Sequence, residues 1–174
     1  MRIPRIYTRQ SLQANAAVEL EPGPSQHLCR VLRMKVGDSL ILFDGSGGQY
    51  PASIHAIGRN VVTAATGGFE AIERESGLQL ELGIAISRGD RMDWVVQKAT
   101  ELGVSSIAPL ATERTEVRLG GERSDKKLRH WQQVANSACE QCGRNRLPQI
   151  LPPQDLGLWL RSVQADIRLV LHHT

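Results

Sequence analysis

The chain has few cysteines, no long apolar run and no repeated segment. Its 174 residues include only three cysteines, an odd number that cannot close a full disulfide framework. The opening Met-Arg-Ile-Pro-Arg-Ile-Tyr lacks the apolar region of a secretory signal. Nowhere do about 18 apolar residues follow one another, so no segment is suited to spanning a membrane. We therefore expect a soluble, cytoplasmic protein in a reducing compartment, without a membrane partner.

Familiar catalytic and metal-binding motifs are also missing. The sequence contains no G-x-S-x-G and no Ser-His-Asp order, and its five histidines lack metal-ligand spacing. Cys139 and Cys142 form a single C-x-x-C, which supplies half of a structural zinc site, and Cys29 lies far upstream without a companion. We expect no metal. A redox or zinc protein remains an alternative hypothesis, beside the interpretation that both cysteines lie on or beside the buried face of a helix.

The composition allows one large domain or two small ones. Hydrophobic residues make up 41% of the chain, enough for a core of this size. The net charge of +3 and the isoelectric point near 9.0 permit phosphate binding without requiring it. Arginine is far commoner than lysine, which favours bidentate and stacking contacts.

The pattern of residues 1–72 is typical of a small β-barrel. Short apolar runs are separated by turn residues, and they cover residues 17–20, 39–43, 53–57 and 61–64. The glycine-rich segment 44–48 leads from one run into the next, which predicts a hairpin turn rather than a phosphate-binding loop. One helix is expected after Ser25. In it Arg30 and Arg33 share an exposed face, while Leu28, Val31 and Leu32 take the opposite, packed face.

Residues 73–174 alternate between strand and helix patterns after a polar linker at 73–77. Strands are expected at 78–86, 104–110, near Ile150 and at 166–171. Helices are expected from an N-cap at Asp90 to Gly103, from an N-cap at Ser124 to Gly143, and over 155–163. The first has an apolar stripe of Met92, Val95, Val96, Ala99 and Leu102, and the second has Leu128, Trp131, Val134, Ala135, Ala138 and Cys142. This alternation predicts a mixed α/β protein with a mainly parallel sheet and helices on both faces.

Ligands of such sheets bind beyond the carboxyl ends of the strands. The loops at 87–89, 111–118 and 171–173 should lie there. Segment 87–90 joins a strand to a helix N-terminus, where an anion contact and simple helix capping are both open interpretations. The charged run 112–129 holds six cations and four acids, so it is either solvated or in contact with phosphate.

Several ordered segments together resemble one family. They are Arg2–Tyr7, His27–Met34, Phe43–Ser46, the unit from Ser87 to Gly103, and Glu140–Arg144. They are similar to the ribosomal RNA small subunit methyltransferase E family, which methylates N3 of a uridine in 16S rRNA. The resemblance covers essentially the whole chain. It implies a PUA-like, RNA-binding β-barrel over 1–72 and a SPOUT-type α/β methyltransferase domain over 73–174, with S-adenosylmethionine as methyl donor, 16S rRNA or the small ribosomal subunit as partner, and a homodimer.

The family holds the methyl donor mainly with a Gly-Pro-Glu-Gly-Gly loop and a Leu-Arg-x-Glu-Thr-Ala segment. Neither motif occurs in the 174 residues, and by the resemblance both would lie beyond Thr174. We therefore expect an incomplete SPOUT domain without its C-terminal knot, an inactive fragment with most cofactor contacts beyond Thr174 and only Leu171 and His172 remaining. A cofactor-independent RNA-binding module is the alternative function.

Methylation at N3 needs an unpaired uracil, because N3 lies on the Watson–Crick edge. Arginines can hold such a strand, and the residues expected to contact RNA are Arg5, Arg9, Arg30 and Arg33 on the barrel and Arg88, Arg114, Arg118, Gln141 and Arg144 near the sheet edge. No proton acceptor is identified. Glu140 and Arg144 are candidates for catalysis, and an i,i+4 salt bridge between them is an equally good interpretation.

Overall fold

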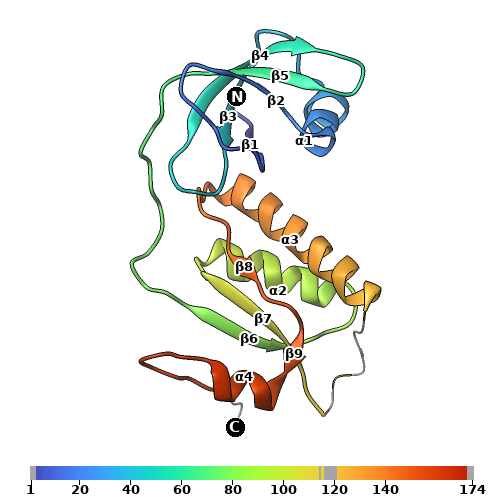
Figure 1. Ribbon diagram of the computed structural model, residues 1–174, viewed down its shortest axis with the longest axis vertical. Coiled ribbons are helices and arrows are strands. Elements are labelled where there is room, and N and C mark those ends of the chain that lie inside the picture. Colours follow the sequence, from blue (N-terminus) through green and yellow to red (C-terminus); the bar gives the residue numbers. More distant parts are fainter. Residues whose placement is uncertain (1–2, 114, 116–120, 172–174) are drawn as a thin grey trace.

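The computed structural model describes residues 3–113, 115 and 121–171, and it contains two sheets joined by an extended segment (Figure 1). A five-stranded sheet has the order β1-β3-β4-β5-β2, and a four-stranded sheet has the order β6-β7-β8 with β9 also paired to β7. The mixed α/β class predicted from the sequence is confirmed. The elements are β1 (Arg5–Tyr7), β2 (Ala17–Glu19), α1 (Pro22–Gln26), the π-helix η1 (His27–Val31), β3 (Ser39–Phe43), β4 (Tyr50–Ile57), β5 (Val62–Thr66), β6 (Glu81–Ala85), α2 (Asp90–Glu101), β7 (Ser106–Ala111), α3 (Glu122–Cys142), β8 (Gln149–Ile150), β9 (Gln154–Asp155) and α4 (Leu156–Ser162).

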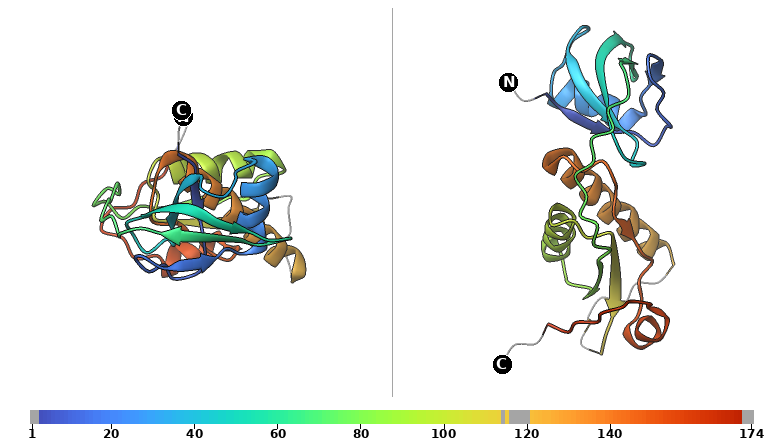
Figure 2. Two further views of the ribbon diagram at one scale, coloured as in Figure 1. Left: turned by 90° about the horizontal axis from the view of Figure 1, so that it is seen from above. Right: turned by 90° about the vertical axis from the view of Figure 1, so that its left-hand side faces the viewer.

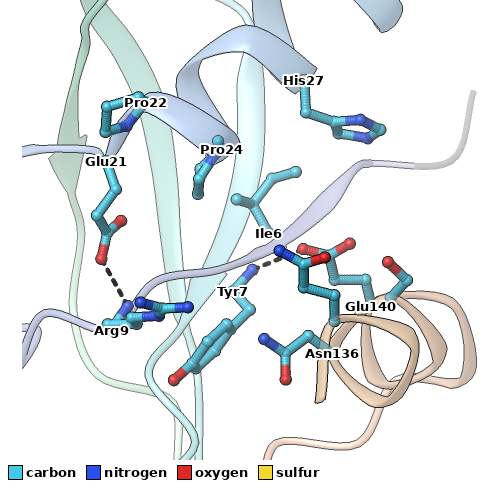
Figure 3. A pocket seen from close by; sticks show the side chains of 12 residues that line it. Ile6, Tyr7, Arg9, Glu21, Pro22, Pro24, His27, Asn136 and Glu140 are labelled. Carbon is cyan, nitrogen blue, oxygen red and sulfur yellow. Dashed lines mark hydrogen bonds between the residues drawn. The ribbon is translucent and has the colours of Figure 1, made fainter. Parts of the chain in front are cut away.

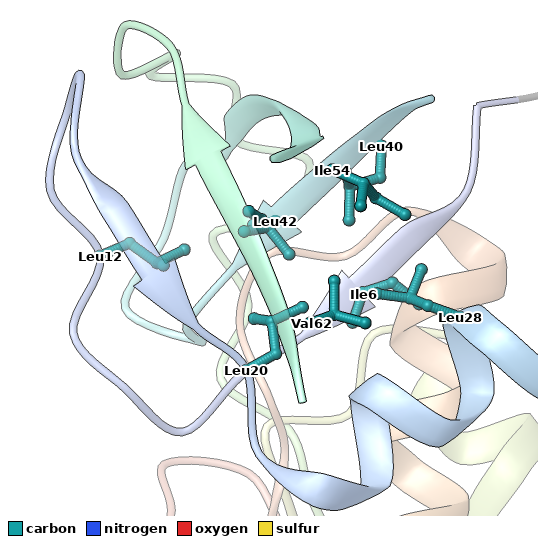
Figure 4. Close-up of a cluster of buried hydrophobic side chains, with 9 residues drawn as sticks. Ile6, Leu12, Leu20, Leu28, Leu40, Leu42, Ile54 and Val62 are labelled. Carbon is teal, nitrogen blue, oxygen red and sulfur yellow. The ribbon is translucent and has the colours of Figure 1, made fainter. Parts of the chain in front are cut away.

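The first sheet curves around its own apolar core (Figure 4). β1 pairs with β3 in parallel, and the other pairs are antiparallel. Alternate residues of the strands point inward, so Leu40 and Leu42 of β3 are buried while Ser39 is exposed. The glycine-rich segment forms the predicted turn between β3 and β4. At Gly48, φ is +68° and a Cβ would lie 2.3 Å from the Phe69 ring, so only glycine fits.

The helix predicted after Ser25 differs from the expectation. A short α-helix passes into the π-helix η1, and Leu28 is its buried contact with the barrel core. Val31 is 66% exposed and Leu32 is 39% exposed, so the predicted apolar face is wrong for both. Arg33 follows the helix with φ of +52°, and it does not share a helical face with Arg30. The wider π turn ends the 3.6-residue periodicity on which the prediction depended.

The second sheet is parallel throughout its described pairs, as predicted. β8 and β9 pair with the same edge of β7 and are separated by Pro152 and Pro153, which lack the N–H that a continuous strand would need.

Helices cover both faces of this sheet. Leu82 and Ile84 of β6 pack with α2 and α3, whereas Gly83 points to the other face. There a Cβ on Gly83 would lie 2.4 Å from the Trp159 ring of α4, and the Trp159 indole N–H donates to Glu81 over 2.6 Å. Figure 2 shows the resulting elongated arrangement, with the barrel and the α4 segment at opposite ends.

The core stripes of α2 and α3 are confirmed for most members, including Met92, Val96, Ala99, Trp131, Ala135 and Ala138. The prediction is wrong for Leu102, which was expected in the buried stripe but is 84% exposed at the end of α2. Cys142 is exposed in the last turn of α3, so only Cys139 is buried. Both helices end before glycines with positive φ, Gly103 and Gly143, as predicted.

Helix starts and the strand expected at 166–171 were predicted less well. Gly89 and Gly121 are the N-caps, so Asp90 and Ser124 lie inside the first turns instead of capping them. The strand expected at 78–86 begins only at Glu81, and Leu78 is 66% exposed. Residues 166–171 form no strand, and Leu171 is 96% exposed. Within the described residues, no helix combines the length and the apolar character needed to cross a membrane.

Candidate functional site

The parallel topology divides the second sheet into two distant edges. α3 connects the carboxyl end of β7 to the amino end of β8, so it runs antiparallel to the strands. Its first turn lies at the carboxyl edge, and its last turn lies at the amino edge, beside the barrel (Figure 1). Eighteen residues separate Glu122 from Glu140, which corresponds to about 27 Å of helix. Residues at the two ends of α3 therefore belong to different sites.

A cleft of about 580 Å³ lies at the amino edge, between the barrel and α3 (Figure 3). Its volume is within the range of pockets for small ligands. The barrel contributes Ile6, Tyr7 and Arg9 from β1 and the following loop, and Glu21, Pro22, Gly23, Pro24 and His27 from the α1–η1 segment. α3 contributes Gln133, Asn136, Ser137 and Glu140.

Glu140 is held at the bottom of this cleft by the backbone of β1. The Tyr7 N–H donates to Glu140 Oε1 over 2.9 Å. Burial raises the pKa of the Glu140 carboxyl above its ordinary value, while the Tyr7 N–H and the positive charges of His27 and Arg5 oppose that rise. The predicted salt bridge to Arg144 does not form, because Arg144 is paired elsewhere.

Glu21 fixes the loop that carries Arg9. Its Oε1 accepts the Arg9 backbone N–H and its Oε2 accepts the Thr8 hydroxyl, each over 2.8 Å. The Arg9 side chain and the His27 side chain are exposed at the cleft. The cleft thus has cationic groups at its opening and a carboxylate at depth.

Arg5 and Arg144 belong to the junction between the two sheets. The Arg5 guanidinium donates to Gln49 Oε1 and to Asn145 Oδ1, each over 2.5 Å, and lies 5.0 Å from the Phe43 ring centroid. Asn145 is completely buried and donates to the Ile72 carbonyl over 2.6 Å. These contacts tie the barrel, the connecting segment and the residues after α3 into one joint.

The Arg144 guanidinium is buried beneath the connecting segment. It forms a bidentate pair with Glu75, with Nε–Oε1 and Nη2–Oε2 distances of 2.8 and 2.7 Å. Its Nη1 donates to the carbonyls of Thr100 and Val104, at the end of α2 and the approach to β7. Arg144 therefore lies at the amino edge. The structure does not bring it together with Arg88, which precedes α2 at the carboxyl edge.

The remaining predicted RNA contacts lie on separate surfaces. Arg30 and Arg33 are exposed on the barrel, and Arg88 is exposed before α2. Gln141 is exposed and lines a groove of about 300 Å³ between α2 and α3, together with Gln97 and His130.

Some of the expected site residues lie outside the described residues. These are Arg114 and Arg118, expected to contact RNA, and His172, expected to contact the cofactor. Thr174, beyond which the sequence reasoning places most of the cofactor contacts, lies outside them as well. Of the two expected cofactor contacts, the structure describes only Leu171, which is exposed and lies in no strand.

A second cavity lies at the carboxyl edge, where the sheet topology predicted a ligand. It has a volume of about 480 Å³ and is lined by the ends of β7 and β9 and the start of α4: Ala111, Thr112, Glu113, Asp155, Leu156 and Gly157. The Asp155 carboxylate caps α4 by accepting the Leu158 N–H. The cavity combines apolar and acidic groups, which suits an organic ligand with a cationic part.

The two cysteines of the C-x-x-C lie in different surroundings, because Cys139 is buried and Cys142 is exposed. Burial raises the pKa of the Cys139 thiol to about 12, which keeps it protonated. Cys139 is free, and so is Cys142. Residues 3–113, 115 and 121–171 contain no group of three or more His, Cys, Asp or Glu side chains arranged to hold a metal.

Sequence reasoning missed Glu21, His27, Asn136 and Asn145. The hydrogen bonds of Glu21 and Asn145 join residues at least 12 positions apart, so no local spacing pointed to them. Asn136 bonds to Gln132 four residues away, and it lies opposite the barrel only through the fold. His27 stood inside a segment used for the family resemblance, which was the one available signal.

Comparison with known proteins agrees with this fold. A family model described as an RNA methyltransferase domain matches residues 74–174, and one described as an RNA methyltransferase PUA domain matches residues 25–65. A Legionella pneumophila protein solved with its bound cofactor SAM superposes with a TM-score of 0.96 at 39% identity, covering 99% of this chain and 71% of that one. The architecture is that of a SPOUT-type methyltransferase with a PUA-like domain.

Relatives with assigned functions narrow the class. Ribosomal RNA small subunit methyltransferase E from Buchnera aphidicola subsp. Acyrthosiphon pisum is 32% identical over 99% of this chain and 68% of its own length. The Neisseria gonorrhoeae enzyme of the same name, solved with S-adenosyl methionine, is 36% identical with a TM-score of 0.89, covering 94% of this chain and 67% of that one. The chain belongs to the ribosomal RNA small subunit methyltransferase E family.

Proposed function

We propose that this protein transfers a methyl group from S-adenosylmethionine to N3 of a uridine in 16S rRNA of the small ribosomal subunit. The observation that carries the proposal is the superposition of nearly the whole chain on a structure that contains SAM. We further propose a division of labour in which residues 1–72 bind rRNA and residues 73–174 form the methyltransferase part. A homodimer acting in the cytoplasm completes the proposal.

The methyl donor fits the cavity at the carboxyl edge better than the cleft between the barrel and α3, which we call the interdomain cleft. The carboxyl edge is where ligands of open α/β sheets bind, and its cavity offers Thr112 and Glu113 as polar partners and Leu156 as an apolar wall. A carboxylate there would favour the positive sulfonium. When bound, the donor supplies an electrophilic methyl group on that sulfonium. Leu171 is proposed to contact the donor as well. The cavity residues were not predicted from the sequence, because most cofactor contacts were expected beyond Thr174.

The protein's part in the reaction is to present an unpaired uracil. N3 must leave its base pair, lose its proton to an acceptor and attack the methyl carbon in line with the bond to sulfur, so that the thioether leaves neutral. Glu140 lies about 27 Å of helix from the carboxyl edge. We therefore propose that Glu140 and Arg144 serve binding and domain assembly rather than proton transfer.

The test gives radiolabelled S-adenosylmethionine and small ribosomal subunits that lack the modification to the whole protein that contains this sequence. The expected result is label in 16S rRNA, which mass spectrometry locates on N3 of one uridine. Label on another base or another atom would contradict the proposed specificity, and RNA binding without any methyl transfer would favour the module that needs no cofactor.

A further inference from the structure

The interdomain cleft presents hydrogen-bonding groups that no described residue uses. Glu140 Oε1 accepts the Tyr7 N–H, and within residues 3–113, 115 and 121–171 no hydrogen bond to Glu140 Oε2 is found. A carboxylate that is partly removed from water needs donors to offset its lost hydration. The cleft is therefore suited to a ligand that brings N–H groups to Glu140.

Asn136 provides the complementary donor. Gln132 Nε2 donates to Asn136 Oδ1 over 3.1 Å, so the Asn136 amide oxygen is engaged and its NH₂ group remains to donate. Asn136 and Glu140 are four residues apart on α3, which puts them one turn apart on one face, and both line the cleft (Figure 3). Together they offer Glu140 Oε2 and the second lone pair of Glu140 Oε1 as acceptors, beside an amide donor.

Among the RNA bases, guanine matches this arrangement. Its Watson–Crick edge carries two adjacent donors, the N2 amino group and N1–H, followed by the O6 acceptor. Uracil has one N–H between two carbonyl oxygens, and adenine and cytosine pair an amino group with a ring acceptor, so each would bring an acceptor against a carboxylate. Glu140 and Asn136 together present acceptor, acceptor and donor, which is the order on the Watson–Crick edge of cytosine.

The other cleft walls suit the rest of a nucleotide. Pro22 and Pro24 offer apolar surface for the face of a base, and the His27 imidazole is a stacking group at the opening. Arg9 is exposed beside the cleft and is positioned by Glu21, so it can contact a phosphate. A phosphate deep in the cleft is disfavoured by the Glu140 carboxylate.

We propose that the interdomain cleft binds one unpaired guanine nucleotide of the rRNA, read by Glu140 and Asn136. This inference rests on the proposed function, since it takes rRNA as the substrate. Because the cleft and the carboxyl edge are at opposite ends of α3, the guanine is a recognition nucleotide and not the methylated base.

The test measures binding of the full chain to the labelled oligoribonucleotides UUGUU, UUAUU, UUCUU and UUUUU by fluorescence anisotropy at one fixed salt concentration. UUGUU should bind about tenfold more tightly than the other three, as expected for one bidentate base contact. Inosine in place of guanine, which lacks the N2 amino group, should lose most of that preference.

Variants connect the preference to the cleft. Glu140→Gln keeps an acceptor for the Tyr7 N–H but replaces one acceptor with a donor, and Asn136→Asp replaces the donor with an acceptor. Each should bring UUGUU down to the affinity of UUAUU, whereas the matched control Glu101→Gln on α2 should keep the preference. Equal binding of all four oligonucleotides by the unmodified protein, or a guanine preference that survives both cleft substitutions, overturns the proposal.

The outcome is separable from that of the proposed function. Methyl transfer to 16S rRNA without a guanine preference would overturn the proposed guanine pocket and leave the proposed function intact. A guanine preference that disappears in both cleft variants, with no methyl transfer by the whole protein, would support the pocket and overturn the proposed reaction.

Discussion

Replacing Arg144 with methionine should destabilise the protein far more than the same change at Arg146. The Arg144 and Glu75 side chains are only 7% and 16% exposed, and Arg144 also donates to two backbone carbonyls. Removing one member of a buried pair leaves the other charge uncompensated, at a cost of about 3–5 kcal/mol. Arg146 pairs with Glu73 over 2.7 Å, but these side chains are 56% and 37% exposed, and such pairs contribute about 0.2–1 kcal/mol.

Urea unfolding followed by the fluorescence of the buried Trp131 measures both free energies of unfolding. The double variant Arg144→Met with Glu75→Leu should recover part of the loss, because it removes both buried charges together. If Arg144→Met costs no more than Arg146→Met, the reasoning that this buried pair stabilises the domain junction is refuted.

Three further results are expected. Cys142 should react quickly with a thiol reagent in the native protein, while Cys139 should react only on unfolding, because it is buried and its pKa is about 12; rapid labelling of Cys139 would contradict its placement. Gly83→Ala should displace α4 and increase its cleavage by protease, since the new Cβ would lie 2.4 Å from the Trp159 ring; an unchanged digestion pattern would count against this contact. The raised pKa of Glu140 means that the native state retains a proton that the unfolded state has lost, so stability should fall as pH rises from about 4.5 through the native pKa, and Glu140→Gln should flatten that part of the curve; an unchanged pH profile in Glu140→Gln would argue against burial of this carboxyl.

Features that depend on one buried face were predictable from the sequence. Met92, Val96 and Ala99 recur at helical spacing because α2 buries one side, and Leu40 and Leu42 alternate because β3 buries one side. Errors occur where the local period changes or stops. The spacing of Val31 predicts a buried position on an α-helix, but Val31 lies in the π-helix η1 and is exposed.

Segment 166–171 shows another limit of pattern reasoning. Ile167, Leu169 and Leu171 alternate like a strand, yet they are 76%, 85% and 96% exposed. A strand forms by pairing with a neighbour, and alternation alone specifies no neighbour.

The site was harder to predict because its contacts join distant residues. Spacing favoured a bond between Glu140 and Arg144, but Glu140 accepts from Tyr7, 133 residues away, and Arg144 pairs with Glu75, 69 residues away. A residue one helical turn away is only one possible partner, because the fold also brings groups from distant segments close to each side chain. The family resemblance identified the function class, but it did not separate the residues at the two ends of α3.

The joint around Asn145 has a consequence for binding. Asn145 accepts from Arg5 on the barrel and donates to Ile72 in the connecting segment, while the Arg74 guanidinium donates to the Gly143 carbonyl over 2.9 Å. Movement of the barrel relative to α3 would have to break these bonds together. The two walls of the interdomain cleft are therefore preorganised, and a ligand entering between them loses little free energy to domain closure.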